Sequence, residues 1–172
     1  MPRFLPLLLL TTTTVLAQTS PAPKHRRTPP ADDDKWLDQV RALENRASHI
    51  LKSELSRKLD PGCDLDKLSN ADFGNCFAAD EAITERNYRD FVAALRTALA
   101  IQMPGTDPKI FPPASKNFAA GEAAWLTYVD KTCAALGDTY EGGSGSPIAE
   151  TGCQQKLTQQ HMKDLNEIFL EN

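Results

Sequence analysis

Apolar side chains recur at steps of three and four residues along four long segments of this chain, a spacing that places them on one face of an α-helix. The segments run over residues 31–59, 72–101 and 115–136, and from Ser146 to about Phe169. Abundant alanine and sparse aromatic residues also favour helices over strands. The sequence therefore predicts an all-α fold, a small bundle of about four main helices.

Acidic residues, glycines and prolines indicate where these helices begin and end. Aspartates at 32–34 suit the start of the first helix, whose dipole favours negative charge there. Pro-Gly pairs at 61–62 and 104–105 end the first and second helices. Gly137 is predicted to cap the end of the third helix, and Ser146 to cap the start of the fourth. The predicted buried faces include Leu55, Leu59, Tyr88, Phe91, Leu95, Trp125, Leu126, Leu136, Met162, Leu165 and Ile168.

Residues 1–17 have the features of a secretory signal peptide: a positive charge at Arg3, an apolar run and short side chains before a cleavage point after Ala17. The run is shorter than the roughly 20 residues of a spanning helix, although an uncleaved anchor stays open as an alternative. We expect a periplasmic or secreted protein without an integral membrane anchor after cleavage. A disordered, proline-rich, basic linker over 18–30 would precede a helical domain over 31–172.

Four cysteines, Cys63, Cys76, Cys133 and Cys153, follow the predicted signal peptide. An even number in an exported chain indicates disulfides, and the absence of close C-x-x-C pairs argues against a metal site. Local closure within each half favours Cys63 with Cys76 and Cys133 with Cys153, although crossed pairings remain open. The second bridge closes about 20 residues, which the chain-entropy model values at about 3 kcal/mol.

Charge is unevenly distributed along the chain. Four of the 19 basic residues (Arg3, Lys24, Arg26 and Arg27) precede Ala31, whereas all 23 acidic residues follow it. The predicted domain is therefore acidic, which disfavours nucleic acid as a partner. An acidic surface favours cationic partners through faster encounter, although solubility alone also explains such a charge.

The segment between the third and fourth predicted helices is the best candidate for function. Its glycines allow unusual backbone angles, and a disulfide at its base would preorganise it for a partner. A flexible turn without a function is the alternative. The candidate partner-binding residues are Asp138, Tyr140, Glu141, Gly142, Gly143 and Ser144.

The sequence shows no convergent set of catalytic residues. His25 falls in the linker, His49 lies beside serines in the first helix, and His161 shares the apolar side of the last helix, where packing explains it best. No phosphate loop, nucleophile elbow or zinc signature occurs. We therefore expect no enzyme activity, cofactor or metal.

The run A-A-G-E-A-A-W-L-T-Y-V-D-K-T-C over 119–133 resembles the signature A-x-x-x-W-x-x-Y/F-R-D-x-x-C of LprI-like lysozyme inhibitors, a bacterial exported family. The Gly-Gly-Ser at 142–144 and the residues around Cys153 are similar to the tail of that family, and Cys63 and Cys76 to its N-terminal part. The resemblance covers about residues 63–170. It implies structural roles for the motif residues Trp125, Tyr128, Asp130, Leu157 and Thr158.

The resemblance implies a helical, disulfide-linked exported domain and, for some members, lysozyme inhibition; a cationic lysozyme would suit the acidic domain. Val129 and His161 replace two family arginines, so any network or contact built on those arginines is expected to be missing.

Two functions stay open. One is a protein-binding module that inhibits lysozyme by occluding its cleft, and the other is a non-inhibitory structural or accessory protein of the cell envelope.

Overall fold

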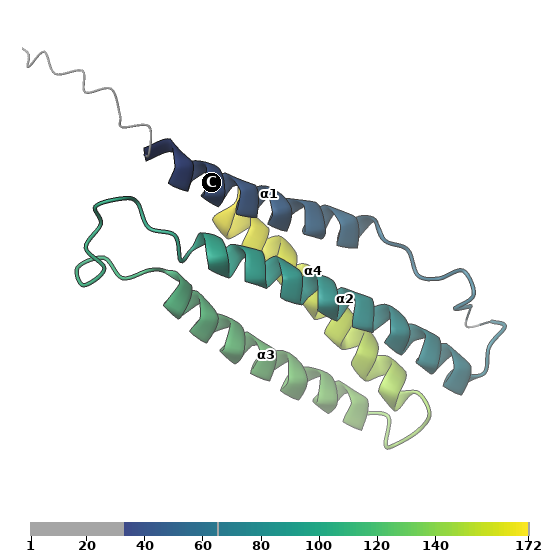
Figure 1. Ribbon diagram of the computed structural model, residues 1–172. Coiled ribbons are helices and arrows are strands. Elements are labelled where there is room, and N and C mark those ends of the chain that lie inside the picture. The colour runs from purple at the N-terminus through teal and green to yellow at the C-terminus, as the bar shows by residue number, and fades with distance from the viewer. Residues whose placement is uncertain (1–32, 65, 172) are drawn as a thin grey trace, which may run out of the picture.

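The computed structural model describes residues 33–64 and 66–171, and the predicted signal peptide and linker lie outside them. The described chain forms four helices, α1 (Asp33–Ser56), α2 (Asn70–Ala98), α3 (Ser115–Asp138) and α4 (Ser146–Phe169). No strand occurs in these two ranges. Figure 1 shows the helices as long rods lying along one another. The predicted all-α bundle of four main helices is confirmed.

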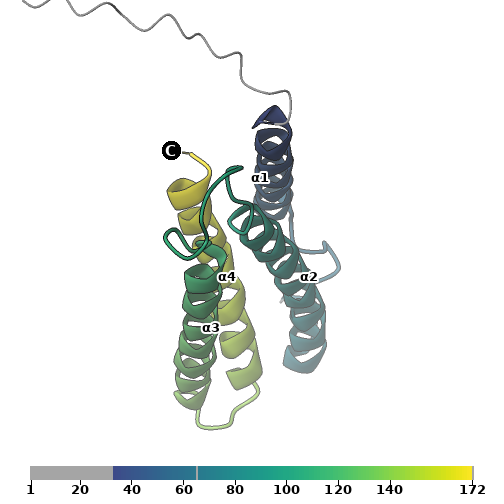
Figure 2. The same ribbon diagram turned by 60° about the vertical axis from the view of Figure 1, so that its left-hand side comes forward.

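Helices α2 and α4 pack against each other, with α1 mainly on α2 and α3 mainly on α4 (Figure 2). Contact between α2 and α3 is slight, so α3 is held chiefly by α4. This edge position leaves α3 a narrow buried face, and the predicted burial of Leu126 and Leu136 is wrong: they are 50% and 42% exposed. Ile168 is also exposed, because Leu165 and Phe169 take the inward positions of that turn.

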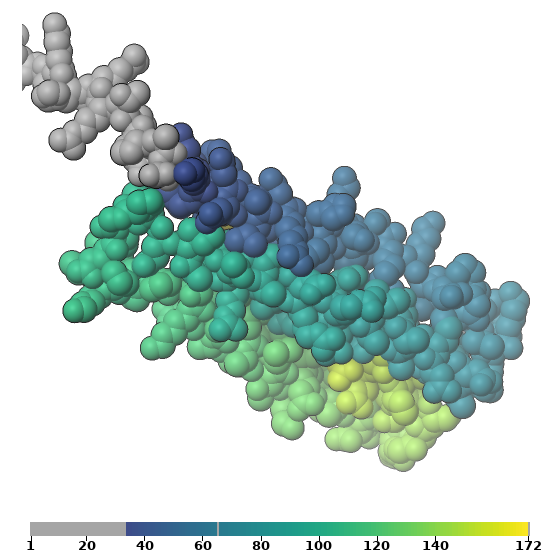
Figure 3. Space-filling model, in the orientation of Figure 1, coloured from purple at the N-terminus to yellow at the C-terminus, as the bar shows by residue number. Residues whose placement is uncertain are grey.

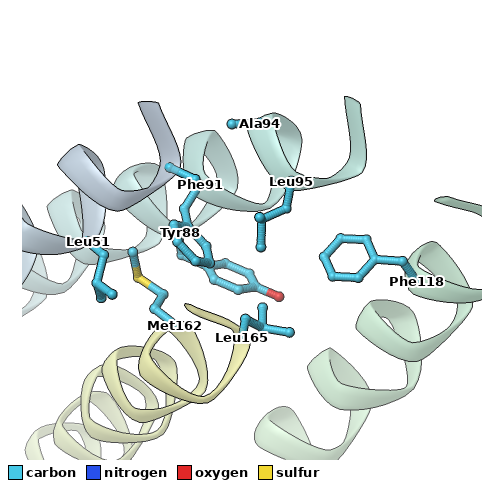
Figure 4. Packing of buried hydrophobic residues seen from close by; sticks show 9 residues of the cluster. Leu51, Tyr88, Phe91, Ala94, Leu95, Phe118, Met162 and Leu165 are labelled. Atoms are coloured by element: carbon cyan, nitrogen blue, oxygen red, sulfur yellow. The ribbon is translucent and has the colours of Figure 1, made fainter. Parts of the chain in front are cut away.

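The core lies where α1, α2 and α4 meet, and Phe118 extends it onto α3 (Figure 4). Phe91 and Met162 have no exposed surface, and Leu95 has almost none. Burying side chains of this size stabilises the fold by about 1.5–3 kcal/mol each. The apolar periodicity therefore located the centre of the core correctly.

Helix α1 ends at Ser56, three residues before its predicted end. Arg57 follows the helix: its backbone N–H donates to the carbonyl of Glu54 at 3.2 Å, and its guanidinium turns back into the bundle. Leu59 consequently lies beyond the helix and is exposed, as is Leu55.

Helix α2 begins two residues earlier than predicted, because Ser69 caps it. The hydroxyl of Ser69 accepts from the backbone N–H of Asp72 at 3.2 Å and donates to the carboxylate of Asp72 at 2.6 Å. A serine followed three residues later by an acid is a recognisable start signal for a helix. Cys63 pairs with Cys76 across this start, with Cα atoms 5.7 Å apart.

The junction of α3 and α4 differs from the prediction. Gly137 is a buried residue within α3 and not its cap, and Ser146 is the first residue of α4, preceded by Gly145 at the N-cap. The hydroxyl of Ser146 instead donates to the carbonyl of Gly137 at 2.9 Å. A Cβ at Gly137 would lie only 3.2 Å from the hydroxyl oxygen of Ser146. Glycine at this position therefore allows the ends of α3 and α4 to approach closely.

Candidate partner-binding loop and buried polar networks

The candidate loop joins α3 to α4 at one end of the bundle (Figure 1). The backbone N–H groups of residues 140, 141, 143 and 146 each donate to the carbonyl three residues earlier, at 2.8–3.0 Å. Glu141 and Gly142 have φ angles of 49° and 74°, a left-handed conformation that is uncommon for glutamate. Consecutive turns therefore give this loop a defined shape.

A hydrogen bond to α2, a contact inside the loop and a disulfide behind it hold the loop in place. Ser144 Oγ accepts from Asn70 Nδ2 at the start of α2, at 3.0 Å. The ring of Tyr140 lies against Gly145, where a Cβ would be only 3.0 Å from a ring carbon. Behind the loop, Cys133 pairs with Cys153 and links α3 to α4, with Cα atoms 5.4 Å apart. Both disulfides thus follow the local pairing that the sequence favoured.

All of the predicted partner-binding residues lie on the surface of this one loop and at the adjoining end of α3. Tyr140 is 50% exposed, and the acidic side chains of Asp138 and Glu141 are exposed beside it. The arrangement presents an aromatic ring and two carboxylates on a backbone whose turns are fixed by hydrogen bonds.

A buried carboxylate that the sequence analysis did not single out connects three helices. Glu122 of α3 is 8% exposed. Its Oε2 accepts from the hydroxyl of Tyr88 on α2 at 2.6 Å, and its Oε1 lies 3.0 Å from Nε2 of His161 on α4. The only sequence signal was its position three residues before Trp125, inside the family-like motif.

His161 is enclosed as expected, and its surroundings are specific. Its imidazole stacks on the indole of Trp125, with ring centroids 4.0 Å apart and planes 9° apart. Burial, reinforced by the bond to Glu122, raises the pKa of Tyr88 far above its usual value, so Tyr88 remains a hydrogen-bond donor. Of the two positions where the resemblance implied an arginine, His161 contacts an acid and Val129 is buried and apolar.

A second buried carboxylate links α1, α2 and α4. Glu54, on α1, is 1% exposed and accepts hydrogen bonds from side chains of α2, of α4 and of the segment after α1. Burial alone would raise the pKa of Glu54, but these bonds, led by that of Arg57, lower it to about 2. The donors are Arg57, Thr84, Asn87 and Gln159, at 2.6–3.1 Å.

Arg57 extends this network to a second acid. It pairs with Asp80 on α2, and the other carboxylate oxygen of Asp80 accepts from Gln155 on α4 at 2.6 Å. Buried charges persist when they are paired and fully hydrogen-bonded. Sequence reasoning missed Glu54, although its spacing of three residues from the buried Leu51 places it on the inward face of α1.

The motif residues separate into inward and outward groups. Thr158 is buried, Trp125 and Leu157 are half-buried, and Tyr128 and Asp130 are exposed on α3.

Within residues 33–64 and 66–171, no three histidines, cysteines or acids are placed to hold a metal ion. In the same residues, no helix is both long and apolar enough to cross a membrane.

The fold and this site define a class: a helical domain with two disulfides that presents an ordered, acidic loop on a bundle fixed by internal ion networks. The family model for the lysozyme inhibitor LprI matches residues 66–165. The chain therefore belongs to the LprI family of lysozyme inhibitors. A search of curated proteins and a search of solved structures find no match.

Proposed function

We propose that this protein is an exported inhibitor that binds a lysozyme and blocks its substrate cleft with the loop from Asp138 to Ser146. Membership of the LprI family supports lysozyme as the partner. The presence of two disulfide pairs supports an oxidising location, periplasmic or extracellular.

The observation that carries the proposal is the ordered geometry of the loop. Hydrogen-bonded turns, the Ser144–Asn70 contact and the disulfide behind the loop hold Tyr140 and Glu141 in exposed positions. A loop that is already ordered loses little conformational entropy when it binds, so more of its contact energy appears as affinity. Tyrosine supplies a large contact area with few rotatable bonds.

Charge supports the same proposal. Asp138 and Glu141 present carboxylates on the loop of an acidic chain, which has a net charge of −4. A cationic lysozyme would be attracted to this end, mainly through a faster encounter. Single exposed ion pairs at the rim contribute only about 0–1 kcal/mol each, so we expect Tyr140 and the loop backbone to supply most of the affinity.

The proposal is tested by inhibition assays against lysozymes of several structural types, with the charge-reversal variant Glu141→Lys. Asp90→Lys, an equal charge change at an exposed position of α2, is the matched control. Because Glu141→Lys replaces an attraction at the rim with a repulsion, we expect it to weaken inhibition by about three- to tenfold, and Asp90→Lys by about twofold or less. Equal loss in both variants would assign the effect to net charge and would remove the loop from the proposal.

A second function is favoured by a different observation, the loop 99–114 between α2 and α3, in which Met103, Ile110 and Phe111 are exposed at the other end of the bundle. If the folded protein with both disulfides inhibits no lysozyme in the assay, the result would favour this second function, a non-inhibitory accessory protein of the cell envelope. Reduced protein, assayed in parallel, shows whether the disulfides are needed for any inhibition that is observed.

A further inference from the structure

Helix α3 packs on α4 and has only slight contact with α2. The space between α2 and α3 is a groove of about 310 Å³, and α4 contributes to its lining. Figure 3 shows part of α4 at the surface between the other two helices. Residues four apart share a helix face, so Glu81 with Glu85 lines the wall formed by α2, and Leu126 with Asp130 the wall formed by α3. We call this site the α2–α3 groove.

Only acidic residues bring charge to the lining of the α2–α3 groove. They are Glu81, Glu85 and Asp130, and no lysine or arginine of the described chain belongs to the lining. Arg89 pairs with Glu85, and Lys131 pairs with Asp130, but these two cations are 63% and 79% exposed. Ion pairs that are open to solvent are weak. The groove therefore has three carboxylates and no cation of its own.

Glu81 is placed where its charge is disfavoured. Its side chain makes no hydrogen bond or ion pair with another described residue. Burial, reinforced by the charge of Glu85 and opposed by that of Arg89, raises the pKa of Glu81. An acid in such surroundings is a common feature of functional sites. A cation bound in the groove would relieve the repulsion between the two glutamates.

Thr158 gives the groove a polar group that the fold leaves unpaired. It is 8% exposed and lines the groove, yet its hydroxyl has no hydrogen-bond partner among the described residues. Its oxygen is not sealed inside the protein, so its open side faces the groove. Thr84, also buried, instead donates to Glu54 at 2.7 Å. Because buried polar groups are nearly always paired, the unpaired hydroxyl of Thr158 favours a ligand with a hydrogen-bond donor at this position.

The apolar part of the groove favours arginine over other cations. Trp125, which is half-buried, and Leu126, which is 50% exposed, both belong to the lining. An arginine side chain can lay its aliphatic stem on apolar surface and its planar guanidinium against an aromatic ring. The guanidinium also has five N–H donors for carboxylates and hydroxyls. The ammonium of lysine is compact and more strongly hydrated, so it suits such a surface less well.

We propose that the α2–α3 groove binds an arginine side chain presented by a protein partner. The guanidinium lies between the carboxylates of Glu81 and Glu85 on one wall and that of Asp130 on the other. It donates to the hydroxyl of Thr158, and the arginine stem covers Leu126. Arginine is among the residues that dominate the affinity of protein interfaces. This proposal does not depend on lysozyme inhibition by the loop from Asp138 to Ser146.

The first test is an NMR titration of the oxidised protein with a blocked tripeptide, acetyl-Gly-Arg-Gly-amide. Matched peptides carry lysine, or citrulline, which has the shape of arginine without its charge. We expect saturable shifts of the amides at 81–85 and 125–130 and of the indole N–H of Trp125. The arginine peptide should bind about threefold or more tightly than the lysine peptide, and the citrulline peptide should give no saturable shift. No saturable shift with arginine, or equal binding of any two of these peptides, would overturn the proposal.

The second test uses variants of the groove. Glu81→Gln/Glu85→Gln should weaken binding of the arginine peptide by about three- to tenfold, while its melting temperature should not fall. Asp34→Asn/Asp38→Asn is the matched control, an equal charge change at exposed positions four apart on α1, and it should bind like the wild type. Thr158→Val keeps the shape of the side chain and should weaken binding by about twofold or more without unfolding the protein. Equal loss in both double variants, or wild-type binding by Thr158→Val, would overturn the proposal.

Discussion

His161 of α4 lies with its Nε2 atom 3.0 Å from Oε1 of Glu122 on α3, and both side chains are largely withdrawn from solvent. This contact joins the edge helix α3 to α4 in the centre of the bundle. Helix α3 has little contact with α2, the other central helix. Glu122 also accepts a hydrogen bond from the hydroxyl of Tyr88 on α2. One carboxylate thus fixes the mutual position of three helices.

Replacing His161 with alanine should destabilise the protein by about 1–3 kcal/mol, because Glu122 loses a partner while remaining buried. The stacking on Trp125 would be lost as well, so tryptophan emission should change. His49→Ala, at an exposed position of α1, should change the free energy of unfolding by no more than about 0.5 kcal/mol. Urea denaturation of both variants measures this, and equal effects would contradict a linking role for His161.

Acid should weaken the fold through Glu54. Its pKa is lowered from 4.5 to about 2 in the folded protein, so its stabilisation is present above the unfolded pKa and is lost as pH falls through the folded pKa. The contribution is on the order of 3 kcal/mol near neutral pH, and more than half should be lost at about pH 3. Urea denaturation at the two pH values measures the difference.

Glu54→Gln isolates this contribution from that of other carboxylates. The variant should be less stable at neutral pH, because Arg57 loses a charged partner, and its stability should fall less between neutral pH and about pH 3. Glu85→Gln, an exposed acid on α2, should keep the wild-type pH dependence. An identical pH dependence in Glu54→Gln and wild type would show that Glu54 does not carry the effect.

The parts of this structure that the sequence predicted are those encoded locally. Apolar spacing defined four helices, and closeness in the chain favoured the pairing of Cys63 with Cys76 and of Cys133 with Cys153. The ion networks were missed because their partners are remote: Asp80 meets Gln155 across 75 residues. Buried acids resemble surface acids in sequence, and only the packing of three helices distinguishes them.

The error at Gly137 has the same origin, since a glycine near a helix end is usually a cap. Here the absence of a Cβ admits Ser146 and Glu150, at 3.2 and 3.4 Å from the Cβ position. The sequence predicted a helix up to residue 101, whereas the exposed loop occupies 99–114, and its apolar side chains could not be placed on the surface from sequence alone.

The two glycines of α3 should respond to alanine in opposite ways. A Cβ at Gly121 would meet nothing within 4 Å, so Gly121→Ala should stabilise the protein by up to about 1 kcal/mol through helix propensity. Gly137→Ala should destabilise it, because Ser146 is held in place by its bond to the Gly137 carbonyl. Thermal melting of the pair tests this, and equal stabilisation would contradict the close approach at Gly137.

Amide hydrogen exchange with and without a lysozyme that the protein inhibits tests the central claim most directly. Residues 139–145 should gain strong protection in the complex, and the substrate cleft of the lysozyme should gain it too. Residues 103–113, at the opposite end of the bundle, should exchange as in the free protein. Protection at 103–113 or along α3, with 139–145 unchanged, would contradict inhibition through the loop from Asp138 to Ser146.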